Sequence, residues 1–565
     1  MEVSHDVLII GAGGAGMRAA YEIAKNKDID VAVVSKIFPT RSHTGAAQGG
    51  INAALNNNRD KGEDSIDSHT FDTVKGSDYL GDQDAIEVMC KNAPKDIIEL
   101  EHMGCLFSRD DDGNIAQRPF GGAGFPRTCY SADITGHVIL HTLYEQLLKK
   151  GVKFYNEFFV LSLIIEEDLI KGVIAIDIAT GELAVMKAST VILATGGAGR
   201  VYSGSTNALV STGDGIAIAY RAGAPLKDME FVQFHPTTLA SNGVLISEAA
   251  RGEGGYLLNK NEERFMEKYA PSAKELASRD VVARAEQTEI NEGRGVDGCV
   301  LLDLRHLGKE KILSRLPQIR ELALDFAGVD CIDEPIPVKP GAHYYMGGID
   351  VNVDGQTSIN GLFACGECAC LSVHGANRLG GNSLLETIVF GKLAGKKAVD
   401  YFSETGKVDD VDPRHLEEVD VFLKKLHEKD GIENVYSIRD DLQKNMNENV
   451  GIFRSEEKIQ KGLDEIEKLK ERYLNVGISD KGKVYNFELT EYFEIGYLLD
   501  LAEATAKSAL LREESRGSHQ REDFPERNDS KFLNHSMTYF NRSGLPNVRY
   551  KRVEITKYKP MERKY

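Results

Sequence analysis

The most constraining feature of the sequence is a glycine-rich turn close to its start. Residues 6–10, DVLII, predict a buried strand, and the next segment, GAGGAGMRAAYEIAK, opens a helix. The glycines that satisfy the pattern GxGxxG are Gly11, Gly13, Gly14 and Gly16. Such glycines allow a tight turn and let a pyrophosphate approach the backbone, while the helix N-terminus supplies N–H groups. With a second strand expected at residues 30–36, the turn predicts a βαβ unit that binds a dinucleotide.

The kind of dinucleotide does not follow from this turn. An NAD enzyme would carry an acidic residue about 20 positions further on, whereas the second strand ends in Ser35 and Lys36. The next loop, PTRSHTGAAQGGINAAL at residues 39–55, is rich in small residues and contains a single imidazole, His43. A bulky imidazole in such a loop is either a packing accident or a group aimed at the ligand.

Charge and length limit the classes of function. The chain has 565 residues, more than one hydrophobic core normally organises, so several lobes are expected. It has 68 Lys and Arg against 87 Asp and Glu, and the net charge of -19 argues against binding to nucleic acid or anionic lipid. An anionic substrate would therefore need a local basic pocket.

Membrane and metal sites are not expected. No apolar run reaches the roughly 18–20 residues of a membrane span, and the N-terminus leads into a strand without a signal peptide, so we expect a cytoplasmic chain or one held at a membrane by a partner. Eight cysteines are scattered, and only Cys365, Cys368 and Cys370 cluster. A metal or iron–sulfur site usually needs four ligands, and the sequence shows no fourth one near these cysteines. The three are therefore interpreted as reduced thiols that pack as small apolar groups.

The pattern along the chain predicts four units. A nucleotide-binding domain spans 1–228 and resumes at 342–402, because strand-then-turn segments recur at STVILATGGAGR and GLFACGECA. The more polar segment 229–341 is expected to form an inserted α+β capping domain. Helical periodicity with interleaved charges dominates 403–515, and a polar, loop-like tail with a short strand pair near VRYKRVEIT makes up 516–565.

Several further motifs occur in a fixed order. They are SKIFPTRSHTGAAQGGI, ATGGAGR, STGDG, EFVQFHPT, SEAARGEGG, RDVVAR, HYYMGGI, CGE and HGANRLGGNSLLE. Together they resemble the flavoprotein subunits of the succinate dehydrogenase and fumarate reductase family, from the first strand to SRGSHQREDFPERND near residue 529. The resemblance implies an α/β fold: a Rossmann-like FAD-binding domain with the inserted capping domain, a helical domain and a C-terminal domain.

The resemblance also implies which residues hold FAD. His43 matches the histidine that bonds covalently to FAD, which requires a neutral imidazole as nucleophile. Asp214 and Glu367 match acidic residues that hold cofactor hydroxyls, and the backbone of Ser383 and Leu384 matches the pair at the pyrimidine end of the flavin. The remaining expected FAD contacts are Gly11, Gly13, Gly14, Gly16, Ser35, Lys36, Ser42, Thr44, Gly50 and Arg378.

A small dicarboxylate is the implied substrate. Arg378 and His343 match the groups that grip one carboxylate, and His235 and Ser247 match those at the other; Arg has a fork geometry suited to a carboxylate. Arg279 aligns with the arginine that transfers the substrate proton, with Glu248 and Arg251 as its relay to solvent. No metal ligand is implied.

The resemblance favours a succinate dehydrogenase that oxidises succinate to fumarate with covalently bound FAD. The chain would pass electrons to an iron–sulfur subunit and, through a membrane anchor, to quinone, at the cytoplasmic face of the cell membrane. Fumarate reductase is the nearest competing function, although Gln48 favours the dehydrogenase. Two more distant candidates are L-aspartate oxidase and a flavin-binding electron-transfer or assembly protein without dicarboxylate chemistry.

Overall fold

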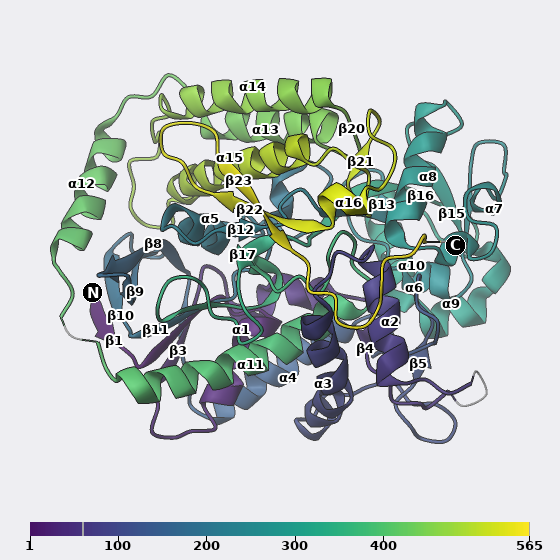
Figure 1. Ribbon diagram of the computed structural model, residues 1–565, viewed down its shortest axis with the longest axis horizontal. Coiled ribbons are helices and arrows are strands. Elements are labelled where there is room, and N and C mark those ends of the chain that lie inside the picture. The colour runs from purple at the N-terminus through teal and green to yellow at the C-terminus, as the bar shows by residue number, and fades with distance from the viewer. Residues whose placement is uncertain (59–61, 409, 564–565) are drawn as a thin grey trace.

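The computed structural model describes residues 1–58, 62–408 and 410–563. It contains a five-stranded parallel sheet, of which β3 and β11 are labelled at the lower left of Figure 1. In spatial order the strands are β18 (Leu362–Ala364), β11 (Thr190–Leu193), β2 (Val7–Ile10), β3 (Val31–Ser35) and β7 (Lys153–Asn156). The three middle strands are buried along their whole length, which explains their nearly continuous Val, Ile and Leu. In the register, Ile9 pairs with both Ile192 and Val33.

Helices cover this sheet. Helix α1 (Gly14–Ile23) follows the glycine turn and packs against α11 (Asn382–Thr405) and α4 (Thr135–Lys149). The close contact of α1 with α11 joins segments that are far apart in sequence, because the chain returns to this sheet after the inserted segment. Nearby lie α2 (Ile66–Gly76) and α3 (Gln83–His102), and a small sheet of β4 (Ile51–Asn52), β6 (Thr128–Cys129) and β5 (Gln117–Arg118).

Two further sheets flank the parallel one. The first contains β1 (Glu2–Ser4), β10 (Leu183–Lys187), β9 (Leu169–Asp177) and β8 (Phe158–Glu166). The second contains β19 (Ala369–Cys370), β17 (Gly348–Asp350), β12 (Leu226–Lys227), β22 (Asn534–Tyr539) and β23 (Asn547–Arg552). Strands β22 and β23 form the short strand pair expected near VRYKRVEIT. The segment NHSMTY, expected to be loop-like, is strand β22 and also pairs with β12, so that part of the expectation is wrong.

The segment between β12 and β17 builds a separate layer, drawn at the right of Figure 1. Its antiparallel sheet contains β13 (Val232–Leu239), β16 (Ile336–Tyr345), β15 (Val300–Asp303) and β14 (Tyr256–Leu258). Its helices are α6 (Ala249–Gly252), α7 (Met266–Tyr269), α8 (Arg279–Asn291), α9 (Lys309–Arg315) and α10 (Pro317–Ala327). These elements enclose a hydrophobic cluster of their own that runs from Leu239 to Val338.

Helices dominate the region after α11. They are α12 (Arg414–Glu428), α13 (Val435–Asn449), α14 (Glu456–Tyr473) and α15 (Phe487–Leu511). The last three lie side by side at the top of Figure 1, and α15 packs on α5 (Asp214–Arg221) of the nucleotide-binding part. The remaining elements are the two-stranded sheet of β20 (Phe453–Arg454) and β21 (Gln520–Arg521), and α16 (Asp529–Phe532).

The α/β fold class is confirmed, with a Rossmann-like parallel sheet, an inserted α+β layer, a helical layer and a C-terminal segment. The boundaries proposed for the four units, 1–228 with 342–402, 229–341, 403–515 and 516–565, stay predictions. None of the described helices is both long and apolar enough to cross a membrane.

Candidate active site

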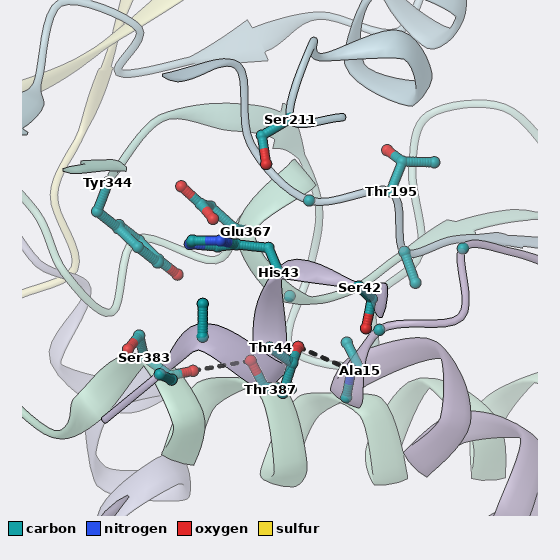
Figure 2. Close-up of a pocket in the computed structure, with 18 of the residues that line it drawn as sticks. Ala15, Ser42, His43, Thr44, Thr195, Ser211, Tyr344, Glu367, Ser383 and Thr387 are labelled. Carbon is teal, nitrogen blue, oxygen red and sulfur yellow. Dashed lines mark hydrogen bonds between the residues drawn. The ribbon is translucent and has the colours of Figure 1, made fainter. Parts of the chain in front are cut away.

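One cavity lies where the glycine turn, the loop after β3, the inserted layer and the start of α11 meet. Figure 2 shows side chains from distant segments, among them His43, Tyr344, Glu367 and Ser383, gathered around it. The expected site residues that line it are Gly11, Gly13, Gly14, Ser35, Lys36, Ser42, His43, Thr44, Gly50, Asp214, His235, Ser247, Glu248, Arg279, His343, Glu367, Arg378, Ser383 and Leu384. Gly16 and Arg251 lie behind the cavity wall.

The glycine turn holds α1 tightly against the end of β11. Gly11 has φ +113°, and a Cβ there would lie 2.2 Å from the carbonyl oxygen of Ala194. A Cβ on Gly16 would lie 2.0 Å from the carbonyl oxygen of Gly11. The N–H of Gly14, at the helix N-terminus, donates to Oγ1 of Thr44 over 3.0 Å. Only glycine therefore fits at Gly11 and Gly16, and the exposed end of the helix faces the cavity.

Lys36 is part of a buried charge cluster. Its Nζ donates to Asp214 at 2.6 Å, to Glu494 at 2.7 Å and to Thr212 at 2.8 Å. Burial opposes the charge of Lys36, but Asp214 and Glu494 outweigh it and raise the lysine pKa. The lysine thus fixes Asp214, the first residue of α5, at the cavity wall.

His43 begins the short 3₁₀ helix η2 (His43–Ala46). The backbone N–H of Ala208 donates to Nδ1 over 3.2 Å, and the side-chain nitrogen of Asn207 lies 3.1 Å from Nε2. Two donors facing the two ring nitrogens disfavour the imidazolium form, which has no acceptor. Burial lowers the pKa of His43 to about 4, so the imidazole is neutral and keeps a lone pair.

Another part of the cavity wall is formed by η7 (Gly366–Cys368) and the start of α11. Oε1 of Glu367 accepts from the N–H of Tyr345 over 3.1 Å, and burial raises the pKa of Glu367 to about 7. Ser383 and Leu384 lie in the first turn of α11, after Gly381 with φ +82°. Unpaired N–H groups at a helix start are available to a ligand.

Four of the expected substrate groups converge beside His43. The rings of His235 and His343 are 4.9 Å apart, edge to face. Nδ1 of His235 accepts from the N–H of Thr237 over 3.2 Å, so its other nitrogen carries the proton and faces outward as a donor. The guanidinium of Arg378 lies 4.5 Å from the ring centre of Tyr344. Ser247 also lines this end of the cavity.

A chain of buried charges leads away from these groups. Arg279, the first residue of α8, donates from Nε to Oε2 of Glu248 over 2.7 Å. Its Nη1 donates to Gln233 over 3.1 Å. Oε1 of Glu248 accepts from the N–H of Gly121 at 2.8 Å and lies 3.7 Å from Nη2 of Arg251. The order Arg279, Glu248, Arg251 thus forms one continuous path into the inserted layer.

The cationic crowding perturbs these groups strongly. Burial, with Arg279 and Arg251 nearby, holds the pKa of His235 well below its usual range. Burial and the charge of Arg279 lower the pKa of Arg378 to about 9. For Glu248, burial would raise the pKa, but Arg279 and Arg251 outweigh burial and lower it. The cavity therefore combines neutral imidazoles with guanidinium groups, a surrounding that favours an anionic ligand.

The sequence analysis missed the residues that hold these groups in place. Thr206 lies 2.7 Å from Nδ1 of His343, and Asn207 also donates to the carbonyl oxygen of His343 over 2.9 Å. Gln233 holds Arg279. The only signal for the first two is a short polar run, STN at residues 205–207, after the third glycine-rich turn.

Comparison with known proteins identifies the family. A family model described as FAD binding domain matches residues 6–384, and one described as fumarate reductase flavoprotein C-term matches residues 439–565. The succinate dehydrogenase flavoprotein subunit of Rickettsia bellii is 49% identical over 572 residues, covering 98% of this chain and 95% of that protein. The chain belongs to the succinate dehydrogenase and fumarate reductase family of flavoprotein subunits. The resemblance seen in the sequence is thereby confirmed.

Both branches of this family occur among its relatives. The fumarate reductase flavoprotein subunit of Mycobacterium tuberculosis is 45% identical over 586 residues, covering 100% of both chains. A solved chain of E. coli quinol fumarate reductase superposes with a TM-score of 0.96 at 41% identity, covering 100% of this chain and 99% of that one. The chain is thus a flavin-dependent oxidoreductase of the succinate and fumarate type.

The cavity of this flavoprotein fits FAD. The turn at Gly11 to Gly16 leaves backbone and a helix end facing it. Several lining polar atoms have no hydrogen-bond partner within the described part of the chain; they are Oγ of Ser42, Oε1 of Gln48, Oγ1 of Thr195 and Nε of Arg378. Buried polar atoms are normally paired. The unpaired atoms are spread along the cavity, as expected if a long polar ligand binds them.

The cysteines of this flavoprotein are all free and buried. Burial raises the pKa of Cys368 to about 11 and that of Cys365 further, so both are thiols rather than thiolates. Among the residues that the structure describes, no cluster of three or more His, Cys, Asp or Glu side chains could hold a metal ion.

Proposed function

We propose that this chain is the flavoprotein subunit of a succinate dehydrogenase, with FAD bonded covalently to His43. The observation that carries the proposal is the group of His235, His343, Arg378 and Arg279 around one end of the FAD-sized cavity. Burying several cationic and donor groups together is costly unless an anion compensates them. Succinate and fumarate are dianions of the right chemistry.

The residues at this end divide between the two carboxylates. Arg378 and His343 grip one of them, where the planar guanidinium can donate two parallel hydrogen bonds. His235 and Ser247 hold the other through the outward N–H of His235 and the hydroxyl of Ser247. Because both imidazoles are neutral, they act as hydrogen-bond donors. The arginines balance the negative charge of the two carboxylates.

Arg279 moves the proton on the substrate carbon. In succinate oxidation Arg279 gives one proton to Glu248 and takes one from the substrate carbon, so its charge is the same before and after, and Glu248 and Arg251 pass a proton onward. The short contacts of Arg279 with Glu248 and Gln233 support this role, since they fix the guanidinium at the cavity wall. FAD, when bound, supplies the acceptor for the hydride that leaves the neighbouring carbon. The protein groups act around that acceptor by excluding water, orienting both carboxylates and handling the proton.

His43 is well placed to be the point of covalent attachment. The nucleophile must be a neutral imidazole. Burial and the donors Ala208 and Asn207 keep His43 neutral. The first residues of the glycine turn hold the pyrophosphate, and Asp214, Glu367, Ser383 and Leu384 surround the rest of the cofactor.

The direction of the reaction is the finer part of the proposal. Gln48 lines the cavity, and the resemblance associates Gln there with dehydrogenases. Relatives of both names match the chain along nearly its whole length, so fumarate reduction is the second candidate. L-aspartate oxidase would not need His43, and a protein without dicarboxylate chemistry would not need Arg279, His235, His343 and Arg378 together.

The partners follow from the family. We propose that electrons leave one at a time to an iron–sulfur subunit, and then to quinone through a membrane anchor. Similar solved structures include quinol-fumarate reductase with menaquinol molecules and Mycobacterium smegmatis Sdh1 in complex with UQ1, which support a quinone partner. The chain would then lie at the cytoplasmic face of the cell membrane, held by its partner subunits.

The decisive experiment compares wild-type protein with His43→Ser on a denaturing gel and in a succinate-dependent dye reduction assay. A covalent flavin survives unfolding, so we expect a fluorescent wild-type band and a dark His43→Ser band. Wild-type protein that is yellow when native but dark on the gel would exclude the covalent bond. Wild-type protein that carries FAD but reduces no dye with succinate would overturn the dicarboxylate function.

A further inference from the structure

Glu286 is a buried carboxyl group that the proposed chemistry does not use. It lies on α8 with 0% of its surface exposed. Within the described part of the chain, neither of its carboxylate oxygens has a hydrogen-bond partner. A buried carboxyl without partners costs folding free energy. Such a group calls for a functional explanation.

Its place on the helix connects it to the proton path. Glu286 follows Arg279 by seven residues, which is close to two helical turns, so both side chains lie on the same face of α8 about 10 Å apart along the axis. Helix α8 packs on β13 and β16, which carry His235 and His343.

Arg251 lies between this carboxyl and the rest of the path. It is 1% exposed, and its Nε and Nη2 have no hydrogen-bond partner among the described residues, although Nη1 donates to the carbonyl oxygen of Glu275 over 2.6 Å. Arg251 and Glu286 each shift the pKa of the other. Two buried groups of complementary charge, both with unpartnered atoms, are thus electrostatically coupled, and a bridging water would complete the hydrogen bonds of both.

Other charged groups near α8 are engaged elsewhere. Glu289 accepts hydrogen bonds from Tyr269 of α7 and from Arg294. Asp303 of β15 accepts from Arg305. Glu267 of α7 accepts from Lys274. The imidazoles of β13 and β16 line the cavity. In the described residues Arg251 is the one charged group that shifts the pKa of Glu286, and burial, the larger effect, raises this pKa well above its usual range.

We propose that Glu286 extends the proton path beyond Arg251 and holds the proton that enters or leaves at its far end. The inference rests on the proposed dicarboxylate function. In succinate oxidation Arg251 receives one proton from Glu248 and gives one to the Glu286 carboxylate, which then releases it to water. In fumarate reduction the same proton moves the opposite way. Only protons move in this step, and the charge of Arg251 is the same before and after.

The pH dependence of the reaction reports this role. The acceptor in succinate oxidation is the ionised form of Glu286, and its raised pKa makes this form scarce at low pH. Activity should therefore fall on the acid side as Glu286 becomes protonated. A carboxyl with only a packing role would leave no mark on the pH profile.

The test uses the holoenzyme with its FAD, comparing wild type, Glu286→Gln and Glu286→Asp. Gln keeps the shape of the neutral side chain. We expect kcat for succinate oxidation to fall roughly 10-fold or more, with KM and FAD content unchanged, and the acid limb to disappear. Glu286→Asp should restore part of kcat and the acid limb of the pH profile. An unchanged kcat, or a lower kcat with the wild-type pH profile, would overturn the inference.

Two further variants separate proton transfer from folding. Glu286→Met removes the unpartnered carboxyl, so we expect a higher Tm together with the same loss of kcat. The control is Glu289→Gln on the same helix, which breaks a bond to Arg294 and should lower Tm without changing the acid limb. A Glu286→Met enzyme as active as wild type would overturn the inference. Failure of the wild type itself to oxidise succinate would instead overturn the proposed function.

Discussion

The proton transfer proposed for Arg279 is unusual for an arginine. A guanidinium group normally keeps its proton in proteins. Its surroundings are unusual too, because it is 6% exposed and shares a small volume with two other buried arginines and one carboxylate, Glu248. The effect on a neighbour is visible in Arg378, whose pKa falls to about 9 through burial and the charge of Arg279. Burial and cationic crowding thus disfavour the charged form of the neighbouring Arg378.

Replacement of Arg279 by Lys distinguishes proton transfer from simple binding. Lys keeps the charge but lacks the second fork nitrogen that contacts Gln233. We expect Arg279→Lys to bind FAD normally while kcat falls by about 100-fold or more. The measurement is succinate-dependent dye reduction, normalised to flavin absorbance. Turnover within a few-fold of wild type would mean that Arg279 only orients the substrate.

Residue types and motifs predicted which groups gather in the site. His235, His343 and Arg378, taken from three separate motifs, line one cavity with Arg279. Their supports could not be predicted, because each depends on a tertiary contact. Thr206 contacts His343, which lies 137 residues later in the sequence. Asn207 contacts His43, which lies 164 residues earlier. A single Thr or Asn in a loop carries no local sign of such a partner.

At the scale of elements, two of the four glycines of the first turn, Gly13 and Gly16, have separable roles. Gly16 has no space for a Cβ, since the carbonyl oxygen of Gly11 would be 2.0 Å away, whereas the nearest atom to a Cβ on Gly13 is 3.5 Å away. We expect Gly16→Ala to lower Tm and FAD content together, at a cost of about 1–3 kcal/mol from overpacking. Gly13→Ala should lose FAD but keep the Tm of FAD-free wild-type protein, because its Cβ meets no protein atom closer than 3.5 Å and lies on the cavity side of the turn. Equal effects on Tm would contradict this division.

Strand β22 depends on a buried ion pair. Nδ1 of His535 lies 2.7 Å from Asp228, beside β12, and Nε2 lies 3.0 Å from Asp82, before α3. Burial opposes the positive charge of His535, but the two carboxylates outweigh burial and raise its pKa from 6.5 to about 9. The charged histidine therefore stabilises the fold by about 3 kcal/mol below pH 6.5, and this contribution is lost as pH rises through 9.

A pH series of melting temperatures checks the sign. We expect His535→Gln to have a lower Tm than wild type, with the largest difference at pH 6.5 and below and a smaller one at pH 9.5. His102→Gln, an exposed position at the end of α3, is the control and should show no such trend. A difference that widens with pH would show that His535 is neutral in the folded chain.

Local patterns predicted some elements and not others. The expected strand at residues 6–10 and the helix after it correspond to β2 and α1, because buried strands and glycine turns have strong local signals. Strand β22, NHSMTY, has a mixed polar pattern, and its main support is Asp228, 307 positions away. Where pairing rather than pattern makes a strand, the sequence does not reveal it.

At the scale of the whole molecule, an acidic chain surrounds a cationic site. The net charge of -19 creates a repulsive field for a dicarboxylate at long range, while Arg279 and Arg378 attract it only inside the cavity. Salt screens these two effects differently, because the Debye length falls from about 30 Å at 0.01 M to about 8 Å at 0.15 M and buried charges are screened much less.

We therefore expect kcat/KM for succinate to rise roughly two- to five-fold between 0.01 M and 0.15 M salt. The measurement is dye reduction by the flavoprotein at saturating dye, repeated with sodium chloride and sodium gluconate to exclude competition by chloride. The inhibition constant of malonate, a dianion that does not react, should fall in parallel, because the same repulsion limits its approach. A fall of kcat/KM with salt would mean that the field of the buried arginines extends beyond the cavity mouth and outweighs the acidic surface.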